Sequence, residues 1–207
     1  MDEQPLSEPE RKEYVAIAMR QSKRVAKLVE QLLEAAKLEA RQIVANPEPF
    51  AIGELLQDVV QKFALAARDR GVALQVDAMA ATTMVSGDFA LLERVLDNLI
   101  DNALRHTPVG GSVTVQSEPQ GDRVRVAVTD TGPGLTREAA GRAFDRFYRG
   151  DPGRSTSSGQ SGLGLAIVKG ILELHGSTIY VESQPGHGAS FHFELPIALQ
   201  PPRSAPV

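Results

Sequence analysis

The sequence predicts an α+β protein, a two-layer α/β sandwich in which helices cover one face of a mixed, largely antiparallel sheet. Two kinds of hydrophobic pattern lead to this prediction. Several segments repeat apolar residues at i, i+3, i+4 and i+7, which is the period of an amphipathic helix. Other short runs alternate apolar and polar residues and are joined in pairs by turns, as in antiparallel hairpins. Because helices alternate with hairpins along the chain, we expect the helices to form one layer against the sheet.

The first expected element is one long helix from Glu8 to about Arg41, with Ser7 as its N-cap. Its apolar stripe consists of Ile17, Val25, Leu28, Val29, Leu32, Leu33 and Ala36. At 1.5 Å per residue such a helix is about 50 Å long, too long to be buried inside a domain of this size. We therefore expect it to pair with another chain, as a homodimer through Glu8–Arg41, or with a removed segment. The alternative is a helix on the surface of its own domain.

Asn46-Pro47-Glu48-Pro49 ends the first helix, because proline lacks an amide hydrogen and restricts the residue before it. The expected division is residues 1–45 as a helical segment, 46–199 as the main domain and 200–207 as a disordered, proline-rich tail. The elements expected within the main domain are a helix at Ile52–Arg70, strands at Val72–Asp77 and Thr82–Ser86, a helix over Leu91–Pro108 capped by Asp88, a hairpin of Ser112–Gln116 and Arg123–Thr129, a short helix at Arg137–Phe144, a buried helix at Leu165–His175, and a hairpin of Thr178–Ser183 and Ala189–Leu195.

Composition excludes several classes of function. The formal net charge of -4 argues against a nucleic-acid-binding protein. The absence of cysteine removes disulfides, thiolate metal sites and cysteine nucleophiles. No apolar run approaches the roughly 20 residues that span a bilayer, and the acidic N-terminus is unlike a signal peptide. We expect a soluble chain without direct membrane contact.

The segment Leu91–Pro108 carries an exposed polar ridge opposite its apolar stripe. Asn98, Asp101, Asn102 and Arg105 follow one another at i, i+3, i+4 and i+7. An amide oxygen is a suitable ligand for Mg²⁺ that keeps its waters and phosphate oxygens, and a nearby arginine can bind phosphate. The alternative is the solvated polar face of an ordinary amphipathic helix.

Two glycine-containing motifs are further candidates. Asp130-Thr131-Gly132-Pro133-Gly134 ends a valine-rich strand, where a carboxylate could accept a hydrogen bond from an exocyclic amine such as that of adenine. A plain turn is the alternative. Gly162-Leu163-Gly164-Leu165 opens a helix whose amides and dipole could receive phosphate, although so short a motif is weak evidence alone. Arg146, Arg149 and Arg154 flank the intervening serine- and glycine-rich stretch and could reach a polyphosphate.

The order of these pieces, Asn98-x-x-x-Asn102, Asp130-x-Gly-x-Gly, then Phe-Asp-Arg-Phe-Tyr-Arg-Gly and Gly162-x-Gly-Leu, resembles the nucleotide-binding catalytic domain of sensor histidine kinases, within the GHKL ATPase superfamily. The resemblance covers about Phe50–Pro196 and implies the Bergerat-type ATP-binding fold. It implies ATP and Mg²⁺, with Asn102 as the Mg²⁺ ligand and Asp130 at adenine. The implied catalytic residues are Asn98, Asn102, Arg105 and Arg149. The implied nucleotide contacts are Asn98, Asn102, Arg105, His106, Asp130, Gly132, Gly134, Tyr148, Arg149, Gly162, Leu163, Gly164 and Leu165, with Asp151–Ser161 as the ATP lid.

Within this superfamily, topoisomerase and chaperone members carry a glutamate four residues before the metal-binding asparagine, as the general base for water. Here that position is Asn98, and a neutral amide is no useful base at pH 7. The resemblance therefore favours phosphoryl transfer to a side chain over efficient hydrolysis.

The long first helix resembles the second helix of the family's dimerisation and phosphoacceptor hairpin. The phosphoacceptor motif itself is not found, since the histidines are His106, His175, His187 and His192, all inside the catalytic domain. His175 is expected to be structural. We expect a fragment that starts in the hairpin loop, does not autophosphorylate, and comes from a membrane-anchored parent with its catalytic part in the cytoplasm.

The predicted function is the ATP-binding part of a sensor histidine kinase, which transfers the γ-phosphate to a histidine on a missing helix or another kinase chain for relay to a response regulator receiver domain. Two alternatives stay open. One is an inactive ATP-binding interaction module, and the other, made less attractive by the long helix, is an anti-sigma-type serine kinase.

Overall fold

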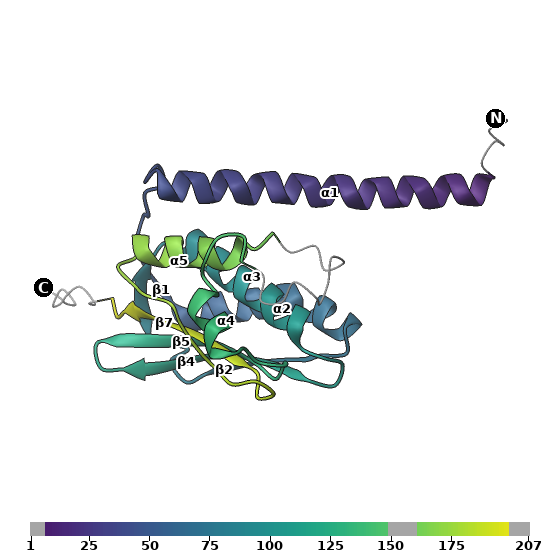
Figure 1. The fold of residues 1–207 in the computed structure, drawn as a ribbon. Coiled ribbons are helices and arrows are strands. Elements are labelled where there is room, and N and C mark those ends of the chain that lie inside the picture. Colours follow the sequence, from purple (N-terminus) through teal and green to yellow (C-terminus); the bar gives the residue numbers. More distant parts are fainter. Residues whose placement is uncertain (1–6, 149–160, 199–207) are drawn as a thin grey trace, which may run out of the picture.

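The computed structural model describes residues 7–148 and 161–198 (Figure 1). Its elements are α1 (Glu8–Glu39), β1 (Glu48–Ala51), α2 (Ile52–Asp69), β2 (Ala73–Ala78), β3 (Met84–Gly87), α3 (Phe89–His106), β4 (Ser112–Gln120), β5 (Arg123–Asp130), α4 (Arg137–Arg142), α5 (Gly164–Leu174), β6 (Tyr180–Ser183) and β7 (Ala189–Pro196). The predicted tail, residues 200–207, lies outside the described residues.

The main sheet has the strand order β2-β4-β5-β7-β6. β2 runs parallel to β4, and the other neighbouring pairs are antiparallel. Helices α2, α3 and α5 lie on one face of this sheet (Figure 1), and the apolar residues of β4, β5 and β7 point toward them into the core. The predicted fold class, a mixed and largely antiparallel sheet covered on one face by helices, is confirmed.

A second, two-stranded sheet was not expected. β1 pairs antiparallel with β3, and Pro49 lies opposite Ser86. A proline is tolerated there because β1 pairs along one edge only, so the missing N–H breaks no second ladder. The proline-rich stretch that predicted a break in the chain therefore also contains a short strand.

Several predicted boundaries shift by one to four residues. The short helix expected to reach Phe144 ends at Arg142, and the ring of Phe144 packs edge-on against Phe191. β4 continues to Gln120 and leaves Gly121-Asp122 as the hairpin turn, with Gly121 at a φ of 64°. The helix expected from Leu165 begins one residue earlier, at Gly164.

Helix α1 lies along α5 at its C-terminal half, and its N-terminal half extends past the rest of the domain (Figure 1). Gln31 and Ala35 are its buried residues, and Leu38 packs over Gly170. This half therefore takes the alternative position, on the surface of its own domain. It does so with a face other than the predicted stripe, because Val25, Val29, Leu32 and Leu33 are exposed. Pairing of that stripe with a second chain stays a prediction.

His175 has the structural role that was predicted for it. Its Nε2 accepts a hydrogen bond from the Asp88 amide at 2.9 Å, and its Nδ1 lies 2.8 Å from the Ile171 carbonyl oxygen, so the ring is neutral with the proton on Nδ1. Asp88 in turn caps α3, as predicted, by accepting from the Leu91 amide, and its other oxygen accepts from the Asn46 amide. His175 thus joins the end of α5 to the start of α3 and to the segment that follows α1.

Replacing His175 by phenylalanine is expected to lower the free energy of unfolding by about 1–3 kcal/mol, because the partly buried Asp88 amide loses its acceptor. Urea denaturation followed by circular dichroism measures this. The matched control is His187→Phe in the exposed β6–β7 turn, which should change stability by less than about 0.5 kcal/mol. Equal effects of the two changes would contradict the assigned role.

No helix among residues 7–148 and 161–198 combines the length and the apolar character that crossing a membrane requires.

Candidate functional site

The polar ridge of α3 is held in place by the opposite face of the helix. That face is fully buried and consists of Leu92, Val95, Leu96, Leu99, Ile100, Ala103 and Leu104. The ridge residues Asn98, Asp101, Asn102 and Arg105 were expected to be exposed, but each is only partly exposed. The reason is that α1 and the start of α5 lie over the ridge.

Asn98 is fixed by one hydrogen bond and by a close neighbour. Its Nδ2 donates to the Arg94 carbonyl oxygen at 2.8 Å. Its Oδ1 lies so near the first residue of α5 that a Cβ added to Gly164 would be 3.0 Å from it. Asn98 of the α3 ridge and Gly164 of the Gly162–Leu165 motif, 66 residues apart in sequence (164 − 98), are therefore direct neighbours.

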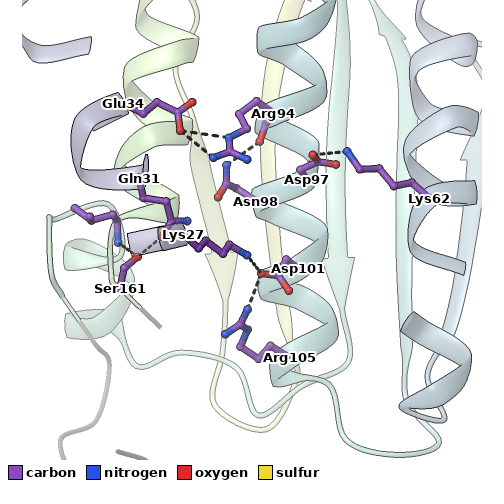
Figure 2. A network of polar contacts seen from close by, with 11 residues as sticks. Lys27, Gln31, Glu34, Lys62, Arg94, Asp97, Asn98, Asp101, Arg105 and Ser161 are labelled. Atoms are coloured by element: carbon purple, nitrogen blue, oxygen red, sulfur yellow. Dashed lines mark hydrogen bonds and ion pairs between the residues drawn. The ribbon is translucent and has the colours of Figure 1, made fainter. Parts of the chain in front are cut away.

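Asp101 is the centre of a charge cluster on the ridge. Its Oδ2 accepts from Arg105 Nη2 at 2.6 Å and lies 3.5 Å from Nζ of Lys27, which comes from α1 (Figure 2). Arg105 is thereby held along the helix face within one turn of Asn102. The carboxylate of Asp101 thus orients an arginine beside the predicted metal ligand.

Asp130 ends β5 and is almost fully buried, with 5% of its surface exposed. The Gly132 amide donates to its Oδ1 at 2.8 Å, and the Ala189 amide also donates to the carboxylate. Burial raises the pKa of Asp130, and these two hydrogen bonds and the nearby His106 only partly oppose the rise. Burying a carboxylate destabilises the folded state, so a purely structural role does not account for Asp130.

His106, the last residue of α3, is close enough to Asp130 for their charges to interact. Desolvation lowers the pKa of His106, the Asp130 carboxylate raises it, and Arg105 lowers it. Gly132 lies between the Asp130 side chain and the His106 backbone, because a Cβ there would be 2.8 Å from Asp130 Oδ1 and 2.9 Å from the His106 carbonyl oxygen. The end of α3 and the end of β5 therefore meet at Gly132.

The raised pKa of Asp130 gives a stability prediction. In the unfolded chain the carboxyl has its ordinary pKa of about 3.8, and in the folded chain its pKa is higher. The folded state is therefore relatively most stable below pH 3.8, and it loses stability as pH rises through the folded pKa. Asp130→Asn removes the buried charge and is expected to raise the melting temperature at pH 7 by on the order of 2 °C. This gain should disappear near pH 3.5 in thermal scans; a lower melting temperature at pH 7 would contradict it.

The glycines after Asp130 are required by the fold itself. Gly134 has a φ of 68°, and a Cβ on it would lie 2.0 Å from the Gln184 carbonyl oxygen. The turn interpretation therefore accounts for Gly134. Gly132 differs, because the atoms it contacts, on Asp130 and His106, both belong to the candidate site.

At the second glycine motif, Gly162 has a φ of 68° and Leu163 is the N-cap residue of α5. Leu163 is buried, and its amide donates to Ser161 Oγ at 3.1 Å. The Leu163 amide therefore already has a partner and is not among the free amides that could receive phosphate. The N–H groups of Gly164 and Leu165, in the first turn, have no acceptor within the helix.

Tyr148 lies beside this motif through its backbone. A Cβ on Gly162 would be 3.0 Å from the Tyr148 carbonyl oxygen, while the Tyr148 ring packs under the Arg142 guanidinium, 4.5 Å from its centroid. Arg146 does not face the ridge but pairs with Glu39 of α1 at 2.6 Å. Arg149, Arg154 and residues 151–160 of the predicted lid lie outside the described residues.

Sequence reasoning missed the residues that α1 brings to the site. Lys27 reaches Asp101, Gln31 reaches Ser161, and Glu34 pairs with Arg94 at 3.0 Å (Figure 2). Their i, i+4, i+7 spacing is visible in the sequence, but polar residues at this spacing are also typical of a solvated helix face. Within the described part of the chain, no group of three or more histidines, cysteines or carboxylates could hold a metal ion, so a metal here would depend on amide oxygens and a ligand.

A family model described as the histidine kinase-, DNA gyrase B- and HSP90-like ATPase matches residues 87–199, more than half of the chain. The chain belongs to this family. The match begins just before the α3 ridge and contains the Asp130 loop and the start of α5, so the resemblance drawn from those motifs is confirmed. The relatives below further identify it as the ATP-binding catalytic domain of a sensor histidine kinase.

Among its relatives is the sensor-like histidine kinase SenX3 of Mycobacterium tuberculosis, 34% identical over 180 residues, which are 87% of this chain and 44% of SenX3. The histidine kinase domain thus spans less than half the length of this relative. Full-length ShkA, solved in complex with AMPPNP, matches with a TM-score of 0.80 and 30% identity over 98% of this chain and 42% of ShkA. The histidine kinase ThkA, solved in complex with the response regulator protein TrrA, matches with a TM-score of 0.74 and 26% identity over 93% of this chain and 53% of ThkA.

Proposed function

We propose that this chain binds Mg-ATP between the α3 ridge, the end of β5 and the start of α5, and transfers the γ-phosphate to a histidine outside these 207 residues, for relay to a response regulator. The observation that carries the proposal is that three separate motifs meet along α3. Gly164 lies against Asn98 at one end of the ridge, and Gly132 lies between His106 and Asp130 at the other. The AMPPNP in ShkA and the response regulator in the ThkA complex support the same assignment.

The residues at the two ends of the α3 ridge suit the two ends of ATP. The Asp130 carboxyl accepts from two backbone amides and can accept a further hydrogen bond from the exocyclic amine of adenine. At the other end, Arg105 and the first-turn amides of α5 supply positive charge for the phosphates. In this proposal Arg149 contributes a further positive charge, and Tyr148 lines the adjoining wall.

The donor set fits Mg²⁺ rather than a softer metal. Asn102 offers a neutral amide oxygen, and the phosphates and waters of a bound Mg-ATP would supply the other oxygens that this ion requires. Bound there, the ion would neutralise charge on the phosphates during transfer. Asn98, one turn away, is held with its Oδ1 toward α5 and can orient the same group.

The chain's own contribution to the reaction is positioning and charge neutralisation. Asn98 cannot activate water as a carboxylate would, so the phosphoryl group awaits a nucleophile brought by the acceptor. This favours transfer to histidine over steady hydrolysis.

The test uses a separately supplied helical hairpin that carries one phosphoacceptor histidine. With Mg-ATP labelled at the γ-phosphate, we expect the hairpin to gain acid-labile, base-stable phosphate, the signature of phosphohistidine. A hairpin with that histidine replaced by alanine is the control. ATP binding without labelling of any histidine hairpin tested would favour the alternative, an ATP-binding interaction module, and phosphoserine would favour the serine kinase.

A homodimer through α1 is the proposed assembly, because its predicted stripe stays exposed. Val25, Val29, Leu32 and Leu33 each expose 50–57% of their surface, which is unusual for a row of apolar residues on one helix. We expect a dimer in sedimentation velocity, and Val29→Glu should raise its dissociation constant at least about tenfold, whereas Glu30→Gln should leave it unchanged. A monomer at every concentration from micromolar to millimolar would contradict the dimer.

A further inference from the structure

Gln31 is a buried polar residue on a helix that is otherwise largely exposed. Only 7% of its surface is accessible, and within α1 it shares this burial with Ala35. A buried amide side chain is unfavourable unless its polar atoms are hydrogen-bonded. Gln31 therefore requires a hydrogen-bond partner in the folded chain.

That partner is Ser161, at the entry to α5. The Ser161 hydroxyl donates to Gln31 Oε1 at 2.8 Å (Figure 2), and its oxygen accepts from the Leu163 amide at 3.1 Å. Because an amide N–H can only donate, the Ser161 oxygen must accept from it, which sends the hydroxyl hydrogen to Gln31. Gln31 thus fixes the direction of a two-step hydrogen-bond chain that ends on the N-cap residue of α5.

These two hydrogen bonds hold the segment that faces the proposed phosphate position. Leu163 is anchored in the core, and the next residue, Gly164, lies against Asn98. On the other side of the segment, the Gly162 carbonyl accepts from the Phe147 amide at 2.9 Å. The turn before α5 is therefore fixed by three contacts: Leu163 in the core, the Phe147 amide, and Ser161. Gln31 of α1 makes the last of these contacts through the Ser161 hydroxyl.

The ion pairs beside Gln31 are less able to do this. Lys27 with Asp101 and Glu34 with Arg94 are partly exposed, so solvent and salt screen them. The Gln31 hydrogen bond is part-buried and carries no net charge, and Gln31 itself exposes only 7% of its surface, so salt does not screen this contact and water has little access to its acceptor.

We propose that Gln31 is a positioning residue for the phosphates of ATP. Through Ser161 it holds the Gly162–Gly164 turn, before ATP binds, in the conformation that binds the phosphates. The inference rests on the proposed function, since it assumes that ATP binds there. It also makes α1 a structural part of the nucleotide site, so that docking of α1 and binding of ATP strengthen each other.

The test is a double-mutant cycle of Gln31→Met and Ser161→Ala, read by isothermal titration of Mg-ATP. Methionine keeps the length of the side chain and removes the acceptor. We expect each single change to weaken Mg-ATP binding about 5- to 10-fold, and the double change to weaken it no further, because both remove one connection. Gln21→Met, at an exposed glutamine of the same helix, is the matched control and should bind as the wild type does.

A second ligand separates positioning from general damage. Adenosine carries the base but no phosphate, so its affinity, followed by NMR at millimolar concentration, should not change in Gln31→Met. Unchanged Mg-ATP binding in Gln31→Met, tighter binding, strictly additive single effects, or an equal loss for adenosine would each overturn the inference. Wild-type protein that binds no Mg-ATP would overturn the proposed function and this inference together, whereas normal wild-type binding with an unaffected Gln31→Met would overturn the inference alone.

Discussion

Asp130→Asn is expected to weaken ATP binding about 100-fold. The asparagine oxygen can still accept from the Gly132 amide, but its NH₂ group then faces the exocyclic amine of adenine, so two donors oppose each other in a buried place. The loss should appear in isothermal titration although the same change is expected to raise the melting temperature at neutral pH. If the variant binds ATP more weakly although it melts at a higher temperature, unfolding does not explain the loss of binding.

Two controls accompany this prediction. Asp122→Asn removes a carboxylate from the exposed β4–β5 turn and should leave ATP binding unchanged. Inosine triphosphate lacks the exocyclic amine, so it should bind the wild type weakly. Asp130→Asn should not weaken the binding of inosine triphosphate any further. Unaltered ATP affinity in Asp130→Asn would mean that adenine does not contact this residue.

Asn102→Ala is expected to reduce the rate of phosphotransfer by about 10²- to 10³-fold and to abolish the effect of Mg²⁺ on ATP affinity. Alanine removes the proposed protein ligand of the ion, and a single preorganised group at a phosphoryl-transfer site has an effect of this size. The measurement is labelling of the supplied histidine hairpin, together with titration of ATP with and without Mg²⁺.

Asn46→Ala, in the exposed segment after α1, is the matched control for this change and should retain both activities. Asn102→Asp is informative as well, since a carboxylate can still bind the ion and should retain part of the Mg²⁺ effect. A variant lacking Asn102 that still responds to Mg²⁺ would show that the ion binds elsewhere.

The fold class and most elements could be predicted because each depends on a local pattern. The alternation of Val124, Val126 and Val128 fixes β5, and the stripe opposite Asn98 fixes α3. β1 was missed because two prolines in four residues normally end regular structure, and only its pairing with β3 makes a strand there. Long-range pairing of this kind leaves no trace in local periodicity.

The site was predicted in part, for a similar reason. The motifs on α3 and β5 were found from their spacing and order, and the family match covers both. The contributions of α1 were not found, because Gln31 differs from a solvated glutamine only through its contact with Ser161, 130 residues away. The partial burial of the ridge was missed for the same reason, since it depends on how α1 and α5 dock.

The measurement that tests the central claim most directly is isothermal titration of the wild-type chain with ATP in the presence and absence of Mg²⁺. The account predicts one site per chain, a dissociation constant between about 1 µM and 1 mM, and clearly weaker binding when the metal is removed. No detectable binding, or equal affinity with and without Mg²⁺, would contradict the assignment of the α3 ridge as an Mg-ATP site.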